Sequence, residues 1–170
     1  IIDMLLKLDT DLDILVVDDN SPDNTAQIVK KYNSDKVFIE ERAEKNGLGT
    51  AYVHGFNWAL KNKYDKIIQM DADLSHDPKE VPDMFDLLDN YDLVIGSRYN
   101  NGLRVINWPI SRLYISYFAN LYARIITGVP AKDLTAGFKG WKSETLHLIN
   151  FNECSSQGYC FQIETSFRAH

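Results

Sequence analysis

Three short apolar runs in this chain each end in a polar cluster that carries charged side chains. The runs occupy residues 13–17, 66–70 and 92–96, and each has the length and composition of a buried β-strand. Helical patterns separate them, and this alternation predicts an α/β fold with an open, mostly parallel sheet and helices on both faces. The carboxyl ends of parallel strands lie along one edge of a sheet, so the polar clusters should line a single cleft.

The remaining elements follow from the same patterns. We expect further strands at 36–40 and 138–141 and helices at 1–8, 24–32, 49–62, 79–88, 109–127 and 159–170. A chain of 170 residues with 45% apolar content suits one domain spanning residues 1–170, and we see no linker or repeat that would divide it. The first and last helical patterns look cut, so we expect the domain to be truncated at both ends.

Asp71 and Asp73 stand just past the second apolar run. On a strand, residues i and i+2 project to the same side, so the two carboxylates can converge on one point. Carboxylates in such a pair repel each other unless a cation joins them, and a hard divalent ion that bridges a substrate diphosphate is a suitable partner. The alternative is a solvated acidic turn, because Asp is common after strands.

Two other clusters could belong to the same cleft. Asp18 and Asp19 follow the first run, and the turn at 47–49 has glycine at its first and third positions. Its backbone amides could meet a phosphate, or the glycines could simply allow a tight turn. Tyr52 stands where a dinucleotide-binding fingerprint needs its last glycine, which argues against a nicotinamide or flavin enzyme.

Charge and cysteine content exclude other classes. A net charge of −6 argues against a nucleic-acid binder, so an anionic substrate would need a metal or placed arginines. Cys154 and Cys160 are too few for a disulfide framework and lack metal-ligand spacing. We therefore expect reduced thiols in a cytosolic setting and no zinc site.

The helix expected at 109–127 is unusually apolar. Its polar residues fall four apart and form a slanting stripe: Arg112, Ser116, Asn120 and Arg124. One interpretation is a core helix whose polar stripe is solvated. The other is a helix at a membrane surface, where Arg112 and Ser116 hold a phosphate while apolar neighbours meet a lipid chain.

Five segments, in this order, resemble the inverting family 2 glycosyltransferases, and more narrowly the dolichyl-phosphate or polyprenyl-phosphate mannosyltransferases. They are Val-Asp-Asp-Asn-Ser-Pro-Asp-Asn-Thr (17–25), Asn-Gly-Leu-Gly-Thr-Ala-Tyr (46–52), Met-Asp-Ala-Asp-Leu-Ser-His-Asp-Pro (70–78), Ile-Gly-Ser-Arg-Tyr (95–99) and Asp-Leu-Thr-Ala-Gly-Phe-Lys (133–139). The resemblance implies a GT-A (Rossmann-like) fold, a nucleotide-sugar donor such as GDP-mannose, Mg²⁺ or Mn²⁺, and a polyprenyl-phosphate acceptor. It also implies a peripheral location on the cytoplasmic face of a membrane.

The resemblance implies three groups of site residues. Those near the donor base and ribose are Asp18, Asp19, Gly47 and Leu48. Those that hold the metal and sugar diphosphate are Asp71, Asp73 and Ser75, the last of which stands where relatives often have Gln. Those around the acceptor phosphate are Arg98, Arg112 and Ser116, while Asp133 belongs to the motif that lines the sugar site. Catalysis is expected to depend on Asp71, Asp73, Arg98 and Asp133.

The chemistry requires no histidine, because a lipid phosphate is already ionised near pH 7 and needs little or no general base. His76 is therefore expected to be a solvated turn residue. The family's first strand and its region beyond residue 170 are not in this sequence, so we expect a poor catalyst. Three alternatives remain: UDP-glucose as donor, a non-catalytic nucleotide-sugar binder, and a haloacid dehalogenase-type phosphatase in which Asp71 is phosphorylated and Asp73 acts as acid.

Overall fold

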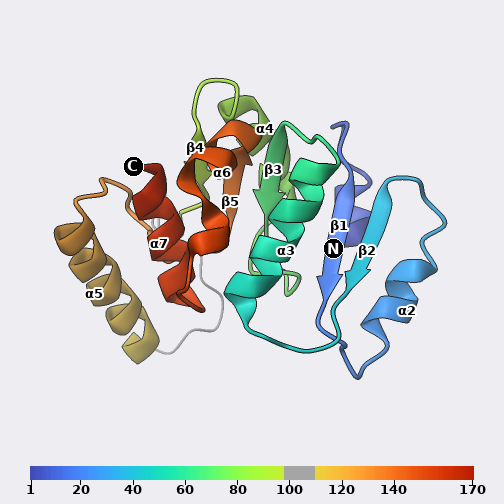
Figure 1. The fold of residues 1–170 in the computed structure, drawn as a ribbon, viewed down its shortest axis with the longest axis horizontal. Helices are drawn as coiled ribbons and strands as arrows, with labels where there is room; N and C mark the ends of the chain where they lie inside the picture. Colours follow the sequence, from blue (N-terminus) through green and yellow to red (C-terminus); the bar gives the residue numbers. More distant parts are fainter. Residues whose placement is uncertain (98–109) are drawn as a thin grey trace.

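The computed structural model describes residues 1–97 and 110–170, and only the backbone of residues 110–113 and 115 (Figure 1). Its first half contains α1 (Ile2–Leu5), β1 (Ile14–Asp18), α2 (Thr25–Lys30), β2 (Val37–Glu41), α3 (Leu48–Lys61) and β3 (Lys66–Gln69). Its second half contains η1 (Pro78–Glu80), α4 (Val81–Leu87), β4 (Leu93–Ile95), α5 (Ile110–Thr127), β5 (Lys139–Lys142), α6 (Ser143–Ile149), η2 (Phe151–Glu153) and α7 (Tyr159–Ala169).

The strand directions confirm the mostly parallel arrangement, although the described strands form two hydrogen-bonded sheets, β1-β2 and β3-β5-β4, rather than one. β1 pairs with β2 in parallel, and β5 lies between β3 and β4 and is antiparallel to both. β3 and β4 therefore point the same way, and β1, β2 and β3 share one direction in Figure 1. Only β5, among the described strands, runs in the opposite direction. Its Gly140 packs beneath Leu88, and a Cβ at this position would lie 3.0 Å from Leu88 Cδ1.

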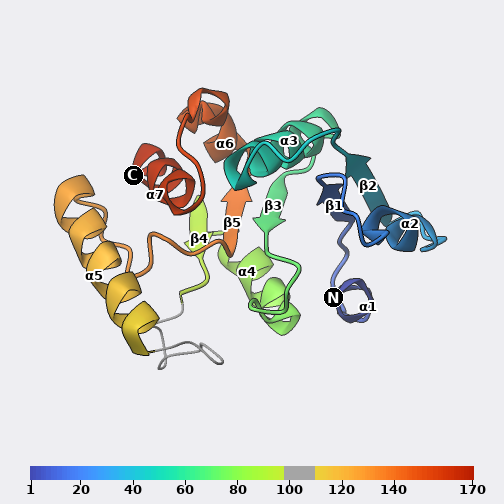
Figure 2. The same ribbon diagram turned by 90° about the horizontal axis from the view of Figure 1, so that it is seen from below.

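Helices cover both faces of the strands, as predicted. Figure 2 shows α3, α6 and α7 on one face and α1 and α4 on the other. The first face buries an aromatic cluster built around Phe56, Trp141, Phe151 and Phe161. The opposite face buries an aliphatic cluster that includes Ile14, Val81 and Met84. Burial of these apolar groups is the main force that holds the layers together.

Two local predictions are corrected, and one helix was not predicted. The first helix spans only Ile2–Leu5 rather than 1–8. The helix expected at 79–88 begins as the 3-10 turn η1, whose N-cap Asp77 accepts a hydrogen bond from the Lys79 N–H before α4 continues to Leu87. The sequence pattern did not predict α6, because seven residues are too few to show a clear helical period.

Helix α5 has its apolar side turned outward, and this contradicts the interpretation as a core helix. It lies at the edge of the molecule, beyond α7 (Figure 1). Its exposed apolar side chains are Tyr114, Tyr117, Phe118, Leu121, Tyr122, Ile125 and Ile126. Asn120, a member of the polar stripe, is instead buried and bonds to Thr135. Within the described residues, no helix is long and apolar enough to cross a membrane.

Candidate functional site

Asp71 lies in the turn that follows β3 and is held from two directions. The Tyr52 hydroxyl of α3 donates to Asp71 Oδ1 at 2.8 Å. The Asp71 backbone N–H donates to His76 Nδ1 at 2.9 Å, and His76 Nε2 lies 4.0 Å from Asp71 Oδ2. The Asp71 side chain keeps 39% of its surface exposed, so the carboxylate remains accessible to a ligand.

His76 is not the solvated turn histidine that the sequence suggested. Its side chain is only 13% exposed, and its ring stacks on Phe138 with centroids 5.0 Å apart and an interplanar angle of 12°. Phe138 is buried just before β5, so this contact joins the Asp71 turn to the start of that strand. The histidine supports the turn that carries Asp71.

Asp73 and Ser75 form the outer part of the same turn. The Ser75 N–H donates to Asp73 Oδ1 at 2.9 Å, and both residues are exposed. The Ser75 hydroxyl, followed by its backbone N–H, lowers the pKa of Asp73, so this side chain is a carboxylate at neutral pH. Leu74, between them, has φ of +64°, a left-handed conformation that is uncommon for a branched residue.

The donor set of this turn fits a hard divalent cation. Asp71, Asp73 and Ser75 offer oxygen ligands, which Mg²⁺ and Mn²⁺ prefer. Among the described residues, no group of three or more His, Cys, Asp or Glu side chains could hold a metal ion. Asp71 and Asp73 could hold an ion such as Mg²⁺, which is commonly bound by one or two carboxylates together with substrate phosphates and water.

Asp18 and Asp19 lie at the end of β1, next to the glycine turn. Asp18 is buried, and its Oδ2 accepts the Ser21 N–H at 3.0 Å. Asp19 forms an ion pair with Arg42, whose Nε lies 2.8 Å from Asp19 Oδ1. Arg42, which is mostly buried just after β2, was not among the predicted site residues.

Arg42 connects these carboxylates to the glycine turn. It donates to Thr50 Oγ1 at 3.0 Å, and Thr50 donates to the Gly47 carbonyl at 2.8 Å. Since Tyr52 lies on the same helix, α3 contacts both Asp19, through Arg42, and Asp71. The residues predicted from separate motifs thus gather around the first two turns of α3.

The backbone conformation and close packing of the glycine turn favour glycine at positions 47 and 49. Gly47 adopts φ of +95° and ψ of 159°, a conformation almost restricted to glycine, and a Cβ there would lie 2.4 Å from Gln157 Oε1. Gly49 lies close to Ser156 and Phe161, where a Cβ would be 3.0 Å from each. Leu48 is exposed beside them. A direct role of Gly47 and Leu48 toward a nucleotide stays a prediction.

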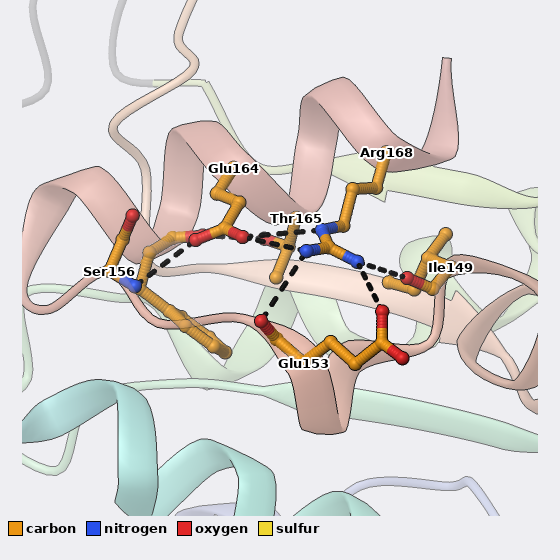
Figure 3. Close-up of polar contacts among 7 residues, drawn as sticks. Ile149, Glu153, Ser156, Glu164, Thr165 and Arg168 are labelled. Atoms are coloured by element: carbon orange, nitrogen blue, oxygen red, sulfur yellow. Dashed lines mark hydrogen bonds and ion pairs between the residues drawn. The ribbon is translucent and has the colours of Figure 1, made fainter.

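The segment between α6 and α7 packs on the glycine turn, and a cluster of polar contacts around Glu164 and Arg168 holds this segment in place (Figure 3). Glu164 of α7 accepts the Ser156 N–H at 3.1 Å and an Arg168 N–H at 3.0 Å. Burial alone would raise the pKa of Glu164, but the bonds from Ser156 and Arg168 outweigh it and lower the pKa. Arg168 also donates to the carbonyls of Ile149 and Glu153. The cluster therefore holds the chain between α6 and α7 against the start of α3.

Behind Asp71 lies a buried polar network. Gln69 donates to the Gly137 carbonyl at 2.8 Å and to Gln162 Oε1 at 3.0 Å, and it accepts from Trp141 Nε1 at 3.0 Å. Lys139 is fully buried and donates to the Gln162 carbonyl at 2.6 Å and to Ser166 Oγ at 2.9 Å. Burial lowers the pKa of Lys139 to about 7.

Asp133 is also fully buried, and it accepts a bond of 3.1 Å from the Thr135 hydroxyl. Its charge opposes the loss of the Lys139 proton, so the two groups act on each other. The structure thus places Asp133 inside the 128–138 loop rather than on its surface, and its predicted role at the sugar stays a prediction.

The structure describes only some of the residues that were predicted to surround an acceptor phosphate. Ser116 lies half-buried on α5, where its carbonyl accepts from Asn120 at 3.0 Å. Arg98 and the side chain of Arg112 lie outside the described residues, so their predicted roles are not tested. Cys154 and Cys160 form no disulfide in the part of the chain that the structure describes.

Comparisons with known proteins show which family and which relatives this chain is similar to. The sequence pattern described as "Glycosyl transferase family 2" matches residues 1–149. The chain is 44% identical over 160 residues to a polyprenol monophosphomannose synthase from Mycolicibacterium smegmatis, an alignment that covers 92% of this chain and 60% of that protein. It is 42% identical over 158 residues to an undecaprenyl-phosphate mannosyltransferase from Micrococcus luteus, covering 92% of this chain and 65% of the relative. The chain thus spans less than two thirds of the length of either relative.

Proposed function

The chain belongs to glycosyl transferase family 2, and we propose that it provides the donor-binding and catalytic residues of an inverting transferase that moves mannose from GDP-mannose to a polyprenyl phosphate. The observation that carries this proposal is the grouping of Asp19, Gly47 and Asp71 around the start of α3. The names of the two relatives support the mannosyl group and the lipid phosphate. The family match removes the phosphatase alternative.

On the donor side, we propose that Asp18 and Asp19 contact the base and ribose. Arg42 holds Asp19 through a mostly buried ion pair, so this carboxylate is oriented before any nucleotide arrives. The turn at Gly47 and Leu48 would lie beside the nucleoside. This arrangement is consistent with a nucleotide that extends from β1 toward the Asp71 turn.

The diphosphate would lie at the turn after β3. A bound Mg²⁺ or Mn²⁺ held by Asp71 and Asp73, with Ser75 in the same turn, would offset the charge that develops on the departing nucleoside diphosphate. The acceptor phosphate oxygen attacks the anomeric carbon from the opposite face, which inverts the configuration. That phosphate is ionised at neutral pH, so no side chain has to remove a proton.

On the acceptor side, we propose that α5 lies against the cytoplasmic surface of a membrane. Its exposed aromatic and aliphatic side has the composition of an interfacial helix, and Tyr114, Tyr117 and Tyr122 are typical of the headgroup region. Ser116 and Arg112 lie one helical turn apart and would contact the lipid phosphate together with Arg98.

Transfer of radiolabelled sugar tests the proposal. We expect mannose to move from GDP-mannose to a polyprenyl phosphate in detergent only when Mg²⁺ or Mn²⁺ is present. Arg112→Ala should weaken use of the lipid phosphate while donor binding is kept, whereas Arg124→Ala on the same helix serves as a matched control. Transfer from UDP-glucose alone would replace the proposed donor, and binding without any transfer would indicate a non-catalytic nucleotide-sugar binder.

A further inference from the structure

We propose that Tyr52 and His76 are positioning residues that hold the Asp71 carboxylate ready for the metal ion. This inference rests on the proposed function, because it concerns the same turn. Tyr52 fixes the side chain through Asp71 Oδ1, and His76 fixes the backbone through the Asp71 N–H. Asp71 is thereby oriented at both ends before a ligand binds.

Tyr52 is itself immobilised by aromatic packing. Its ring stacks on Phe161 of α7 with centroids 6.1 Å apart and an interplanar angle of 6°, and it lies 6.3 Å from Phe56. Both partners are almost fully buried. A tyrosine hydroxyl keeps its proton at neutral pH, so Tyr52 remains a hydrogen-bond donor to Asp71.

The His76 ring is also held in place by two contacts. Stacking on Phe138 sets the plane of the ring, and the bond from the Asp71 N–H requires Nδ1 to be the unprotonated nitrogen. The same bond stops the turn from rotating about the Asp71 backbone.

Gly137 closes the third side of this arrangement. A Cβ on Gly137 would lie 3.4 Å from Asp71 Oδ2 and 3.5 Å from both His76 Cε1 and the Tyr52 hydroxyl oxygen. A side chain at position 137 would therefore contact all three residues, so glycine leaves this space open beside the Asp71 carboxylate. The Gly137 carbonyl accepts a hydrogen bond from Gln69, so Gly137 is connected to the buried polar network behind Asp71. Asp71 Oδ1 is occupied by Tyr52, which leaves Oδ2 as the oxygen expected to bind the ion.

Partners that orient a metal ligand usually change metal affinity by about 10-fold to 100-fold when they are removed. Tyr52→Phe removes one hydroxyl and keeps the stacked ring. We expect Mn²⁺ affinity to fall by at least about 10-fold in this variant, with little change in thermal stability. Tyr64→Phe is the matched control, because the Tyr64 hydroxyl also donates to an aspartate, Asp13, on an exposed surface away from Asp71.

A second pair of variants tests His76 by rescue. His76→Asn places an amide oxygen close to the position of Nδ1 and can still accept the Asp71 N–H, whereas His76→Ala cannot. We expect Mn²⁺ affinity to be lost in His76→Ala and largely retained in His76→Asn. A purely structural role of the ring in packing on Phe138 would damage both variants alike.

The measurement is a titration of Mn²⁺, followed by the electron paramagnetic resonance signal of the free ion, with and without GDP. Equal affinity of Tyr52→Phe and the wild-type protein would overturn the inference while leaving the proposed function intact. If the wild-type protein binds Mn²⁺ but neither GDP-mannose nor UDP-glucose, the proposed function fails, and the ratio of Mn²⁺ affinities still decides the inference. Absence of Mn²⁺ binding by the wild-type protein under both conditions would overturn the inference as well.

Discussion

Lys139 should make the stability of this protein rise with pH in the alkaline range. The side chain is fully buried between β5 and α7, and burial lowers its pKa from 10.5 to about 7, although the charge of Asp133 opposes the shift. Below pH of about 7 the lysine carries a proton in both the folded and the unfolded chain. Between this value and 10.5 the unfolded chain binds a proton that the folded chain has lost, so the free energy of unfolding increases with pH.

The expected size follows from the same shift. One pKa unit corresponds to about 1.4 kcal/mol, so the increase from pH of about 7.5 to about 9.5 should be on the order of 2–3 kcal/mol. Urea unfolding followed by tryptophan fluorescence measures it, and Trp141 in the adjacent core is a suitable reporter.

Two variants separate Lys139 from other groups that titrate in this range. Lys139→Met keeps the apolar length of the side chain and should lose the increase. Lys142→Met should keep it, because Lys142 lies on the same strand but is partly exposed and pairs with Asp92 at 3.1 Å. An equal pH dependence in the wild-type protein and Lys139→Met would refute the reasoning.

Three further outcomes are expected. Gly47→Ala forces a side chain into a backbone conformation that only glycine adopts readily and should cost about 1–3 kcal/mol in urea unfolding, whereas Gly55→Ala, inside α3 with ordinary contacts, should be neutral or stabilising. Asn120→Ala leaves a buried backbone N–H without its acceptor and should cost about 1–3 kcal/mol, while the exposed Ile125→Ala should change stability by less than about 0.5 kcal/mol in the same assay. Asp73→Ala should abolish metal-dependent donor binding in calorimetry, and unchanged donor affinity would contradict the metal assignment.

The strands and most helices could be predicted because their apolar patterns are local. The position of β5 between β3 and β4 could not, since its pairing with Ile67 and Leu93 depends on residues far away in the sequence. The stripe on α5 showed that one side of the helix differs from the other. It did not show which side faces inward, because the partner that buries Asn120 is Thr135, on a separate loop.

The candidate site shows the same limit. Motifs located Asp19 and Asp71, and the structure adds the residues that hold them: Arg42, Tyr52 and His76. Arginine, tyrosine and histidine at these positions carry no distinctive spacing, so sequence reasoning had no signal for Arg42 and treated His76 as solvated. These roles depend on contacts that the folded chain makes, because α3 lies between the turns that carry Asp19 and Asp71.

The central claim is that the acidic turns bind a nucleotide sugar through a divalent metal. Calorimetric titration of the protein with GDP-mannose and with UDP-glucose, with and without Mn²⁺, tests it most directly. We predict binding of GDP-mannose that requires Mn²⁺ and is tighter than that of UDP-glucose. Binding of neither donor, or donor affinity that is the same with and without Mn²⁺, would contradict this claim.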